Sequence, residues 1–411
     1  MKTRAVRLYG ENDLRLEEFE LPALKDGEIL LKVVSDSVCM STYKTVKQGA
    51  KHLRVPDDVA GHPVIVGHEF CAEVAEVTDR WKDTYHVGDK VVMPPVLSYL
   101  GGMQTVGYSF GEIGGLSTYA VAYAHIVENG YLIRLDSDSF FKGSLIEPAS
   151  CVIRGYKASL HLDEDGKPYA GVKPDGKVVI LAGCGPMGLV AVDIALHGDV
   201  KPSMVVVTDL NAERLARAKQ LFPPEKAKAD GIDLVFTDSS DKDELLALSD
   251  GGFDDVFVYA PVPAVAELGD AILAFDGCLN FFAGPLDKNF SANINFYNVH
   301  YKQHHVSGSS GSSVEDMRDV VRLISEKRID PAVMITHIGG IDAAIDTTKR
   351  LPEIPGGKKL IYTHINLALT ALADFGALGE KDPRFAVLDK LVKESNGLWN
   401  AAAEAYLLAN F

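Results

Sequence analysis

Residues 177–188 read KVVILAGCGPMG, an apolar run that ends in the pattern G-x-G-x-x-G. A continuous apolar run of this length is typical of a parallel strand covered on both faces. In such a turn the first glycine allows the tight bend, the second lets a pyrophosphate approach the backbone, and the third lets the next helix pack closely on the strand. The pattern predicts a dinucleotide-binding turn, with these cofactor-binding residues: Gly183, Gly185, Pro186, Met187 and Gly188.

An acidic residue stands where such a turn needs one. Asp209 ends the next apolar run, 21 residues after Gly188. A carboxylate there accepts hydrogen bonds from the ribose hydroxyls and repels a 2′-phosphate, so the sequence favours NAD(H) over NADP(H). Arg214 follows on the next predicted helix and is a candidate to stack on the adenine. The alternative for the whole unit is a doubly wound fold that binds no nucleotide.

The order of predicted elements indicates an α/β protein with two kinds of domain. Apolar runs alternate with helix-period stretches from Lys177 to Phe282, which predicts a doubly wound parallel sheet. The first hundred or so residues are instead short β-rich runs separated by Gly, Pro and Asp, which favours an irregular, partly closed β-barrel. We expect a barrel domain at 1–155, a Rossmann domain at 156–300, and a return to the barrel domain with a helical extension at 301–411.

Charge and cysteine usage narrow the function classes. The chain has 411 residues, a net charge of −16 and five scattered cysteines. Such a charge argues against nucleic acid or an anionic membrane as a partner. An odd, scattered cysteine set argues against a disulfide framework and for a reducing compartment. No apolar stretch is long enough to span a bilayer and no signal region is visible, so we expect a cytoplasmic protein.

Three short motifs offer metal ligands. Cys39 follows a predicted strand, His68 and Glu69 adjoin one another after Gly67, and Glu147 precedes Pro148. A thiolate, an imidazole and a carboxylate together suit zinc, and three protein ligands leave a fourth position for substrate oxygen. There the metal would act as a Lewis acid on an alcohol or a carbonyl. Spacing alone does not establish this set, because 12 histidines and 57 acidic residues allow many such combinations.

The chain resembles the zinc-containing medium-chain alcohol and polyol dehydrogenases over about residues 1–360. The marks that carry the resemblance are Cys39 with Ser41, Gly67-His68-Glu69, Gly88-Asp89-Lys90-Val91, Gly115 to Tyr119, Glu147-Pro148 and the turn at 183–188. The resemblance implies a GroES-like catalytic barrel beside the Rossmann domain. It further implies a catalytic zinc held by Cys39, His68 and either Glu147 or Glu69, with Ser41 beginning a proton relay.

The chain departs from the family at two places. Met40 stands where members often have glycine or histidine, and Thr42 stands where they often have aspartate. These two changes put the proton relay in doubt. Many members bind a second, structural zinc through four cysteines in the lobe near residues 95–115. No cysteine lies between Cys71 and Cys151, so we expect one catalytic zinc per subunit and no structural zinc.

Residues 1–70 are most similar to the L-sorbose 1-phosphate reductase branch of this family. That likeness implies NAD(H)-linked interconversion of L-sorbose 1-phosphate and D-glucitol 6-phosphate. A substrate phosphate on so acidic a protein needs local basic groups, and a basic segment follows Cys39. Its members are Lys44, Lys47, Lys51, His52 and Arg54, of which we expect Lys44, Lys47 and His52 to bind substrate. The alternative for this segment is an ordinary solvated basic face.

Three other functions stay open: an unphosphorylated polyol (sorbitol-type) dehydrogenase, a zinc-free reductase of the same fold, and a non-catalytic nucleotide-binding protein.

About 49 residues follow the predicted strand at 358–362, with helix signals from Asp382-Pro383 to Asn396-Gly397 and a last amphipathic segment at 398–411. This extension packs on the barrel domain or contacts another subunit. We expect a homo-oligomer, dimer or tetramer.

Overall fold

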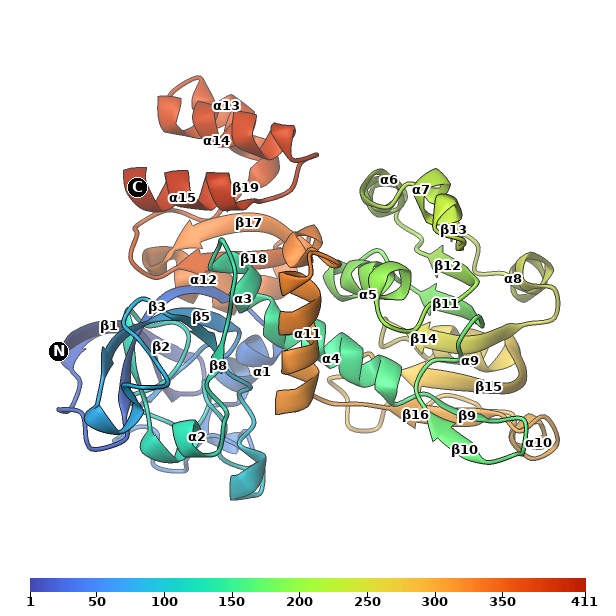
Figure 1. Ribbon diagram of the computed structural model, residues 1–411, viewed down its shortest axis with the longest axis horizontal. Helices are drawn as coiled ribbons and strands as arrows, with labels where there is room; N and C mark the ends of the chain where they lie inside the picture. The colour runs from blue at the N-terminus through green and yellow to red at the C-terminus, as the bar shows by residue number, and fades with distance from the viewer. The chain divides into compact units, whose positions relative to one another are not determined.

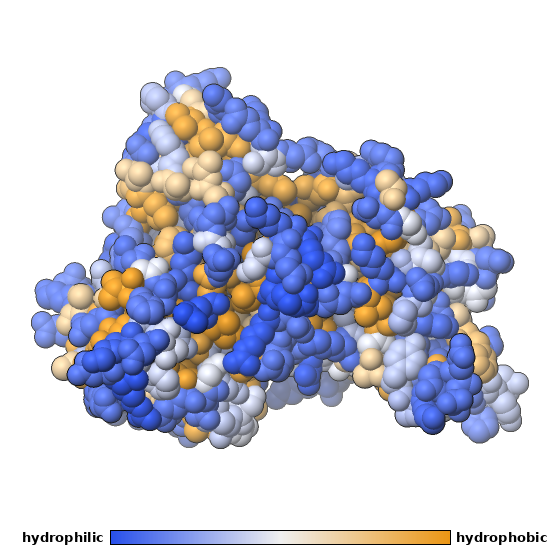
Figure 2. Space-filling model, in the orientation of Figure 1, coloured by the Kyte–Doolittle hydropathy of each residue, from blue (hydrophilic) through white to orange (hydrophobic).

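The computed structural model describes residues 1–411, and its internal contacts divide the chain into two compact units (Figure 1). The first unit contains residues 1–148, 313–325 and 335–411, and the second contains residues 149–312 and 326–334. Each unit has its own β-sheets and its own apolar core. On the face shown in Figure 2 the surface is mainly hydrophilic, with hydrophobic residues in scattered groups.

The second unit is built on a six-stranded parallel sheet in the order β13-β12-β11-β14-β15-β16. In chain order its strands are β11 (Lys177–Leu181), β12 (Met204–Thr208), β13 (Asp233–Thr237), β14 (Phe253–Val258), β15 (Leu273–Phe281) and β16 (His305–Gly308). This 3-2-1-4-5-6 order is that of a doubly wound dinucleotide-binding fold, and the crevice for the ligand forms where the strand order reverses, at β11. The predicted doubly wound sheet is confirmed.

Helices and a hairpin complete the second unit. Its helices are the greater part of α4 (Ile146–Lys157), α5 (Pro186–His197), α6 (Ala212–Leu221), α7 (Pro224–Ala229), α8 (Lys242–Ser249), α9 (Pro263–Ala271) and α10 (Phe296–Tyr301). The antiparallel hairpin is β9 (Leu160–Leu162) and β10 (Pro168–Ala170). Val179, Val206 and Val256 from neighbouring strands are fully buried in one cluster, because strands covered on both faces need apolar side chains throughout.

The first unit is a curved, mostly antiparallel β structure, as the irregular barrel prediction requires. Its larger sheet runs β19-β17-β18-β3-β5-β6-β8, with β7 also paired to β3, and a smaller sheet runs β2-β1-β4. The strands are β1 (Lys2–Gly10), β2 (Asp13–Glu20), β3 (Ile29–Ser37), β4 (Val64–Ile65), β5 (Phe70–Val77), β6 (Lys90–Val92), β7 (Tyr119–Ala122), β8 (Ile133–Arg134), β17 (Ile335–Gly340), β18 (Lys358–Tyr362) and β19 (Thr370–Ala371). Strand β3 is central, because it pairs with β18, β5 and β7.

Short helices surround these sheets, and the last three form the C-terminal extension. The helices of the first unit are α1 (Met40–Gln48), α2 (Ala124–Glu128), α3 (Phe141–Ser144), α11 (Val314–Ser325), α12 (Ala344–Lys349), α13 (Phe375–Gly379), α14 (Pro383–Glu394) and α15 (Ala401–Asn410). Asp382 caps α14 by accepting a hydrogen bond from the backbone N–H of Arg384. The extension belongs to the same compact unit as the barrel, as the simpler of its two predicted roles requires.

Candidate metal centre

The pairing of two strands brings the predicted ligands together. Cys39 follows β3 and forms the N-cap of α1, whereas His68 and Glu69 immediately precede β5. Strands β3 and β5 are antiparallel, with Asp36 opposite Phe70, and the Ser37 N–H donates to the Glu69 carbonyl at 2.9 Å. The end of one strand therefore lies beside the beginning of the other, which places the thiol next to the imidazole and the carboxylate.

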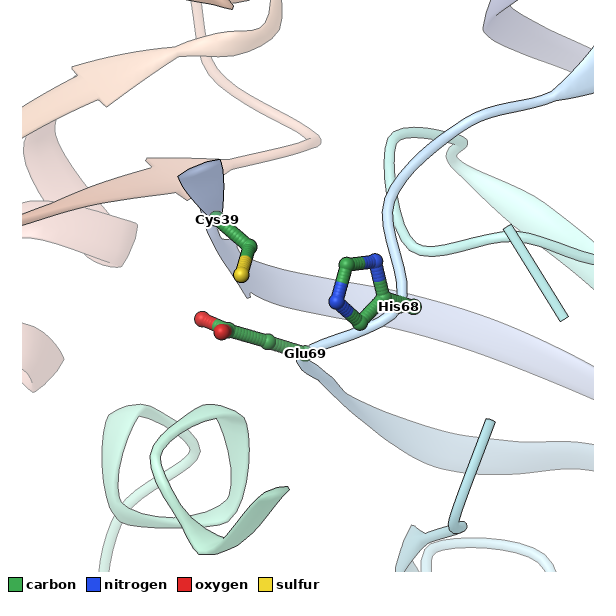
Figure 3. Close-up of side chains that lie close together, drawn as sticks. All are labelled: Cys39, His68 and Glu69. Carbon is green, nitrogen blue, oxygen red and sulfur yellow. The ribbon is translucent and has the colours of Figure 1, made fainter. Parts of the chain in front are cut away.

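One ligand atom from each of Cys39, His68 and Glu69 lies within 4.8 Å of the other two. Figure 3 shows the thiol, the ring and the carboxylate directed toward a common space. His68 and Glu69 are almost fully buried, at 4% and 1% exposure. Thiolate, imidazole and carboxylate form a donor set that suits zinc. The three residues fit the metal that the sequence predicts.

Two hydroxyl groups of α1 orient these side chains. The Ser41 hydroxyl donates to the Cys39 sulfur at 2.9 Å and lies 3.2 Å from His68 Nε2. The Thr42 hydroxyl oxygen lies 3.3 Å from His68 Nδ1. If Nδ1 carries the proton and donates to Thr42, the Nε2 lone pair is left for a cation. Burial lowers the pKa of His68 to about 4, which keeps the ring neutral as a metal ligand must be.

Glu69 has a second partner that the sequence did not reveal. Lys358, on β18, places its ammonium 2.6 Å from Glu69 Oε1 and 2.5 Å from Oε2, and the Ser37 hydroxyl also donates to this carboxylate. Burial by itself lowers the pKa of Lys358, but the charges of Glu69 and Cys39 outweigh it and the pKa is raised. The Glu69 carboxylate is thus held by a buried ammonium at the edge of the ligand group.

Glu147 lies in the first turn of α4 and is outside the close group of three ligands. It is nevertheless buried, at 8% exposure, and its charge acts on the Cys39 thiol. Burial first, and then the charges of Glu69 and Glu147, raise the pKa of Cys39 to about 12 against the opposing charge of Lys358. Without a cation the Cys39 thiol therefore keeps its proton, and a bound cation would favour the thiolate that a metal ligand must be.

The predicted nucleotide turn is formed in the second unit. Gly185 caps α5 and Pro186 occupies the first turn of that helix. A Cβ at Gly188 would lie 2.1 Å from the Gly183 carbonyl oxygen, so close packing of helix on strand requires glycine there. A Cβ at Gly185 would meet nothing within 4 Å, which leaves its backbone open to a ligand. Met187 is on the same first turn of α5.

Asp209 comes directly after β12, at the carboxyl edge of the sheet. One of its carboxylate oxygens accepts from the Cys184 N–H at 3.2 Å, and the other accepts from the Asn211 N–H at 2.9 Å. These bonds fix the carboxylate beside the glycine turn. Arg214 lies exposed on α6, and its N–H donates to the Asn211 side chain.

Two segments of the chain match protein-family models. Residues 25–129 match the alcohol dehydrogenase GroES-like domain, and residues 186–326 match the zinc-binding dehydrogenase domain. The chain is 45% identical to L-sorbose 1-phosphate reductase of Klebsiella pneumoniae, covering 99% of this chain and 98% of that protein. It is 43% identical to mannitol-1-phosphate 5-dehydrogenase of Aliivibrio fischeri, over 99% and 97% of the two chains.

The chain belongs to the zinc-binding alcohol dehydrogenase family. Its fold matches the crystal structure of 2R,3R-butanediol dehydrogenase from Bacillus subtilis with a TM-score of 0.71, over 88% of this chain and all of that chain, at 23% identity. As a member of this family the protein is an enzyme that uses zinc and a nicotinamide cofactor. No helix combines the length and apolar character that a membrane-spanning segment requires.

The lobe that holds a structural zinc in many family members is organised by apolar packing in this chain. Val96 and Thr105 form an antiparallel bridge across it. Leu97 and Val106 are fully buried in the barrel core with Ile113. This packing can hold the lobe without cysteine ligands.

The basic segment that follows Cys39, whose first members lie on α1, separates into two parts. Lys51 forms an ion pair with Glu11 at 2.7 Å, and the Lys47 ammonium lies over the Tyr43 ring. Lys44 is half-buried on α1. The His52 ring instead stacks on the Tyr108 ring, with the ring centroids 5.4 Å apart. The Tyr108 ring also packs, at a tilt, against the His68 ring, with the centroids 5.1 Å apart. Of the expected substrate residues, His52 is therefore connected to the metal centre, through an aromatic residue that motif analysis missed.

Proposed function

We propose that this enzyme reduces the ketone of a sugar phosphate to a secondary alcohol with NADH, and catalyses the reverse oxidation, with L-sorbose 1-phosphate and D-glucitol 6-phosphate as the pair. The observation that carries this proposal is the close group of Cys39, His68 and Glu69 in a chain that also has the glycine turn at 183–188. The L-sorbose 1-phosphate reductase of Klebsiella pneumoniae, similar over the whole chain, supports L-sorbose 1-phosphate as the ketone of this pair.

We propose that Cys39, His68 and Glu147 hold one catalytic zinc, and that Glu69 stays paired with Lys358. The support is the geometry of Glu69, both of whose oxygens already contact the Lys358 ammonium. If Glu69 bound the metal directly, its carboxylate would neutralise less of the buried Lys358 charge, and leaving a buried charge unpaired costs substantial free energy. When bound, zinc supplies a Lewis acid that polarises the substrate carbonyl. The absence of cysteines between Cys71 and Cys151 supports a single zinc.

The protein's own residues position the reactants and move the proton. Ser41, whose hydroxyl already donates to the Cys39 sulfur, begins the relay that delivers a proton to the new alkoxide. Thr42 holds the His68 ring. The nicotinamide cofactor supplies the hydride, and the glycine turn at 183–188 binds its diphosphate at the N-terminus of α5. Asp209 accepts from the adenosine ribose hydroxyls, and we propose NAD(H) rather than NADP(H) on that ground.

Metal analysis and initial rates test this proposal together. The purified protein should hold about one zinc per chain and reduce L-sorbose 1-phosphate with NADH far faster than with NADPH. Cys39→Ala should lose both zinc and activity, whereas Cys278→Ala, which removes a buried thiol of the second unit, should keep both. Faster turnover of unphosphorylated sorbitol than of any sugar phosphate would replace the substrate assignment. Full activity without metal would remove the zinc.

A further inference from the structure

Arg54 is a half-buried arginine that has no acidic partner. Its only hydrogen bonds are made by its backbone, whose N–H donates to His52 Nδ1 at 3.2 Å and whose carbonyl accepts from the Ser109 hydroxyl at 2.7 Å. In a chain with a net charge of −16, Arg54 is thus a basic side chain that no acidic side chain neutralises. Guanidinium groups bind phosphate through two parallel hydrogen bonds, so this side chain is suited to an anion from outside the chain.

The position of Arg54 is fixed relative to the metal centre by the loop at residues 105–109. A Cβ at Gly107 would lie 2.4 Å from the Gly67 carbonyl oxygen, so the loop passes directly against the residue before His68. Ser109 then bonds the Arg54 carbonyl, and Tyr108 packs between the His52 and His68 rings. The His68–Tyr108–His52 stack therefore connects the ligand group to the segment that carries the free guanidinium.

His52 offers a second donor at this place. Its Nδ1 accepts from the Arg54 backbone N–H, so the ring is in the tautomer that carries its proton on Nε2. That N–H has no partner within the chain. Electrostatics agree with the placement: burial lowers the pKa of His68 and of His52, and the Arg54 charge lowers both further. The guanidinium is thus close enough for its charge to act on the metal ligand.

We infer that Arg54 and His52 form the binding site for the phosphate group of the substrate, next to the metal centre. This inference rests on the proposed function and names the residues that would bind the substrate phosphate. It divides the basic segment into one part that binds substrate and one that does not. Lys51 is excluded by its ion pair with Glu11. The phosphate would lie against the guanidinium fork and the Nε2–H, while Tyr108 keeps both groups at a set distance from His68.

Steady-state kinetics on single variants test the site. Arg54→Gln should raise the KM for L-sorbose 1-phosphate about 10- to 100-fold, the loss expected for charged hydrogen bonds, and weaken competitive inhibition by inorganic phosphate by a similar factor. The KM for unphosphorylated L-sorbose or sorbitol should change less than about 3-fold. His52→Gln should shift the same constants by a smaller factor. Arg54→Lys, which keeps the charge but loses the fork, should fall between wild type and Arg54→Gln.

Lys51→Gln is the matched control, because it removes a neighbouring charge that already has a partner, and it should leave all these constants near wild type. Equal KM increases for phosphorylated and unphosphorylated substrates, or no increase with Arg54→Gln, would overturn the inference. Calorimetric binding of inorganic phosphate to the zinc-loaded protein tests the site without turnover. Binding lost in Arg54→Gln supports the site even if no sugar phosphate is reduced, whereas equal binding in both proteins, or none in wild type, overturns it.

Discussion

The carboxylate of Glu404 accepts a hydrogen bond from the backbone N–H of Phe140 at 2.6 Å. The same side chain accepts from the Phe141 N–H at 2.8 Å and from the Tyr362 hydroxyl at 2.7 Å, and the Trp399 indole donates to that hydroxyl at 2.7 Å. The C-terminal extension thus caps α3 and contacts β18 through one buried carboxylate. Helix α3 leads to Glu147, and β18 carries Lys358, so the extension supports two segments that flank the metal centre.

Replacing Glu404 with Ala should destabilise the first unit by about 3 kcal/mol, because two backbone N–H groups and a phenol would lose their shared acceptor in a buried place. Denaturant unfolding of the metal-free protein measures the change. Glu394→Ala provides the control, since Glu394 is exposed on α14 of the same extension and makes only a long ion pair with Lys390. Equal stability of the two variants would contradict the capping role.

The local sequence pattern was sufficient to predict the strands and helices of the nucleotide-binding unit. Gly188 must be glycine because a Cβ there would lie 2.1 Å from the Gly183 carbonyl oxygen, and the motif encodes that close approach within six residues. Asp209 follows because strand and helix lengths in such a unit are narrowly set. The α14 boundaries were also predictable, since Asp382-Pro383 is a start signal that acts within one turn.

The partners of the metal centre could not be predicted in the same way. Lys358 is 289 residues from Glu69, and only the pairing of β18 with β3 brings its segment to the site. Nothing local marks a lysine on a buried strand as a counter-charge. Tyr108 reaches His68 because Gly107 packs on Gly67, a contact between two loops. Long-range strand register and loop packing are tertiary properties. A family motif predicts the ligand residues themselves, but not the residues that tertiary packing brings beside them.

Thr42 should matter to zinc affinity although it is not a ligand. Thr42→Val removes the hydroxyl beside His68 Nδ1, so the ring loses the group that fixes its orientation and its tautomer. Loss of such outer contacts weakens metal binding about 10- to 100-fold. Zinc release to a chromogenic chelator gives the affinity. Thr42→Ser retains the hydroxyl and should behave like wild type; an equal loss in both variants would show that packing, not the hydrogen bond, is responsible.

The Lys358–Glu69 pair is best tested by a double-mutant cycle. Lys358→Met leaves the buried Glu69 carboxylate without its ammonium and should cost about 3 to 5 kcal/mol of unfolding free energy in the metal-free protein. Glu69→Gln combined with Lys358→Met removes both charges and should recover much of that loss. Chemical denaturation of the four proteins provides the coupling. Additive effects of the two substitutions would show that the ammonium and the carboxylate do not depend on one another.

A buried histidine should give the second unit a pH-dependent stability. His161 Nε2 lies 3.1 Å from a carboxylate oxygen of Asp255, and Nδ1 lies 3.0 Å from the Asp276 carbonyl oxygen. Both neighbours are acceptors, so both ring nitrogens donate and the folded state favours the cation. Burial, the largest single effect, lowers the pKa of His161, but the hydrogen bond and charge of Asp255 and the contacts with Asp276 outweigh it, and the pKa is raised.

Because the folded-state pKa is above the unfolded one, the stabilisation by His161 is complete below the unfolded value of about 6.5 and is lost as pH rises through the folded value. The unfolding free energy should therefore decline above about pH 6.5, with a contribution of at most about 1.4 kcal/mol per pH unit from this group. His161→Gln can still donate to Asp255 but does not titrate, so its profile should be flatter in that range. Denaturant unfolding at a series of pH values measures the difference. A wild-type slope that survives unchanged in His161→Gln would assign it to another group, such as His197, whose hydrogen bond with Asp193 also raises its pKa.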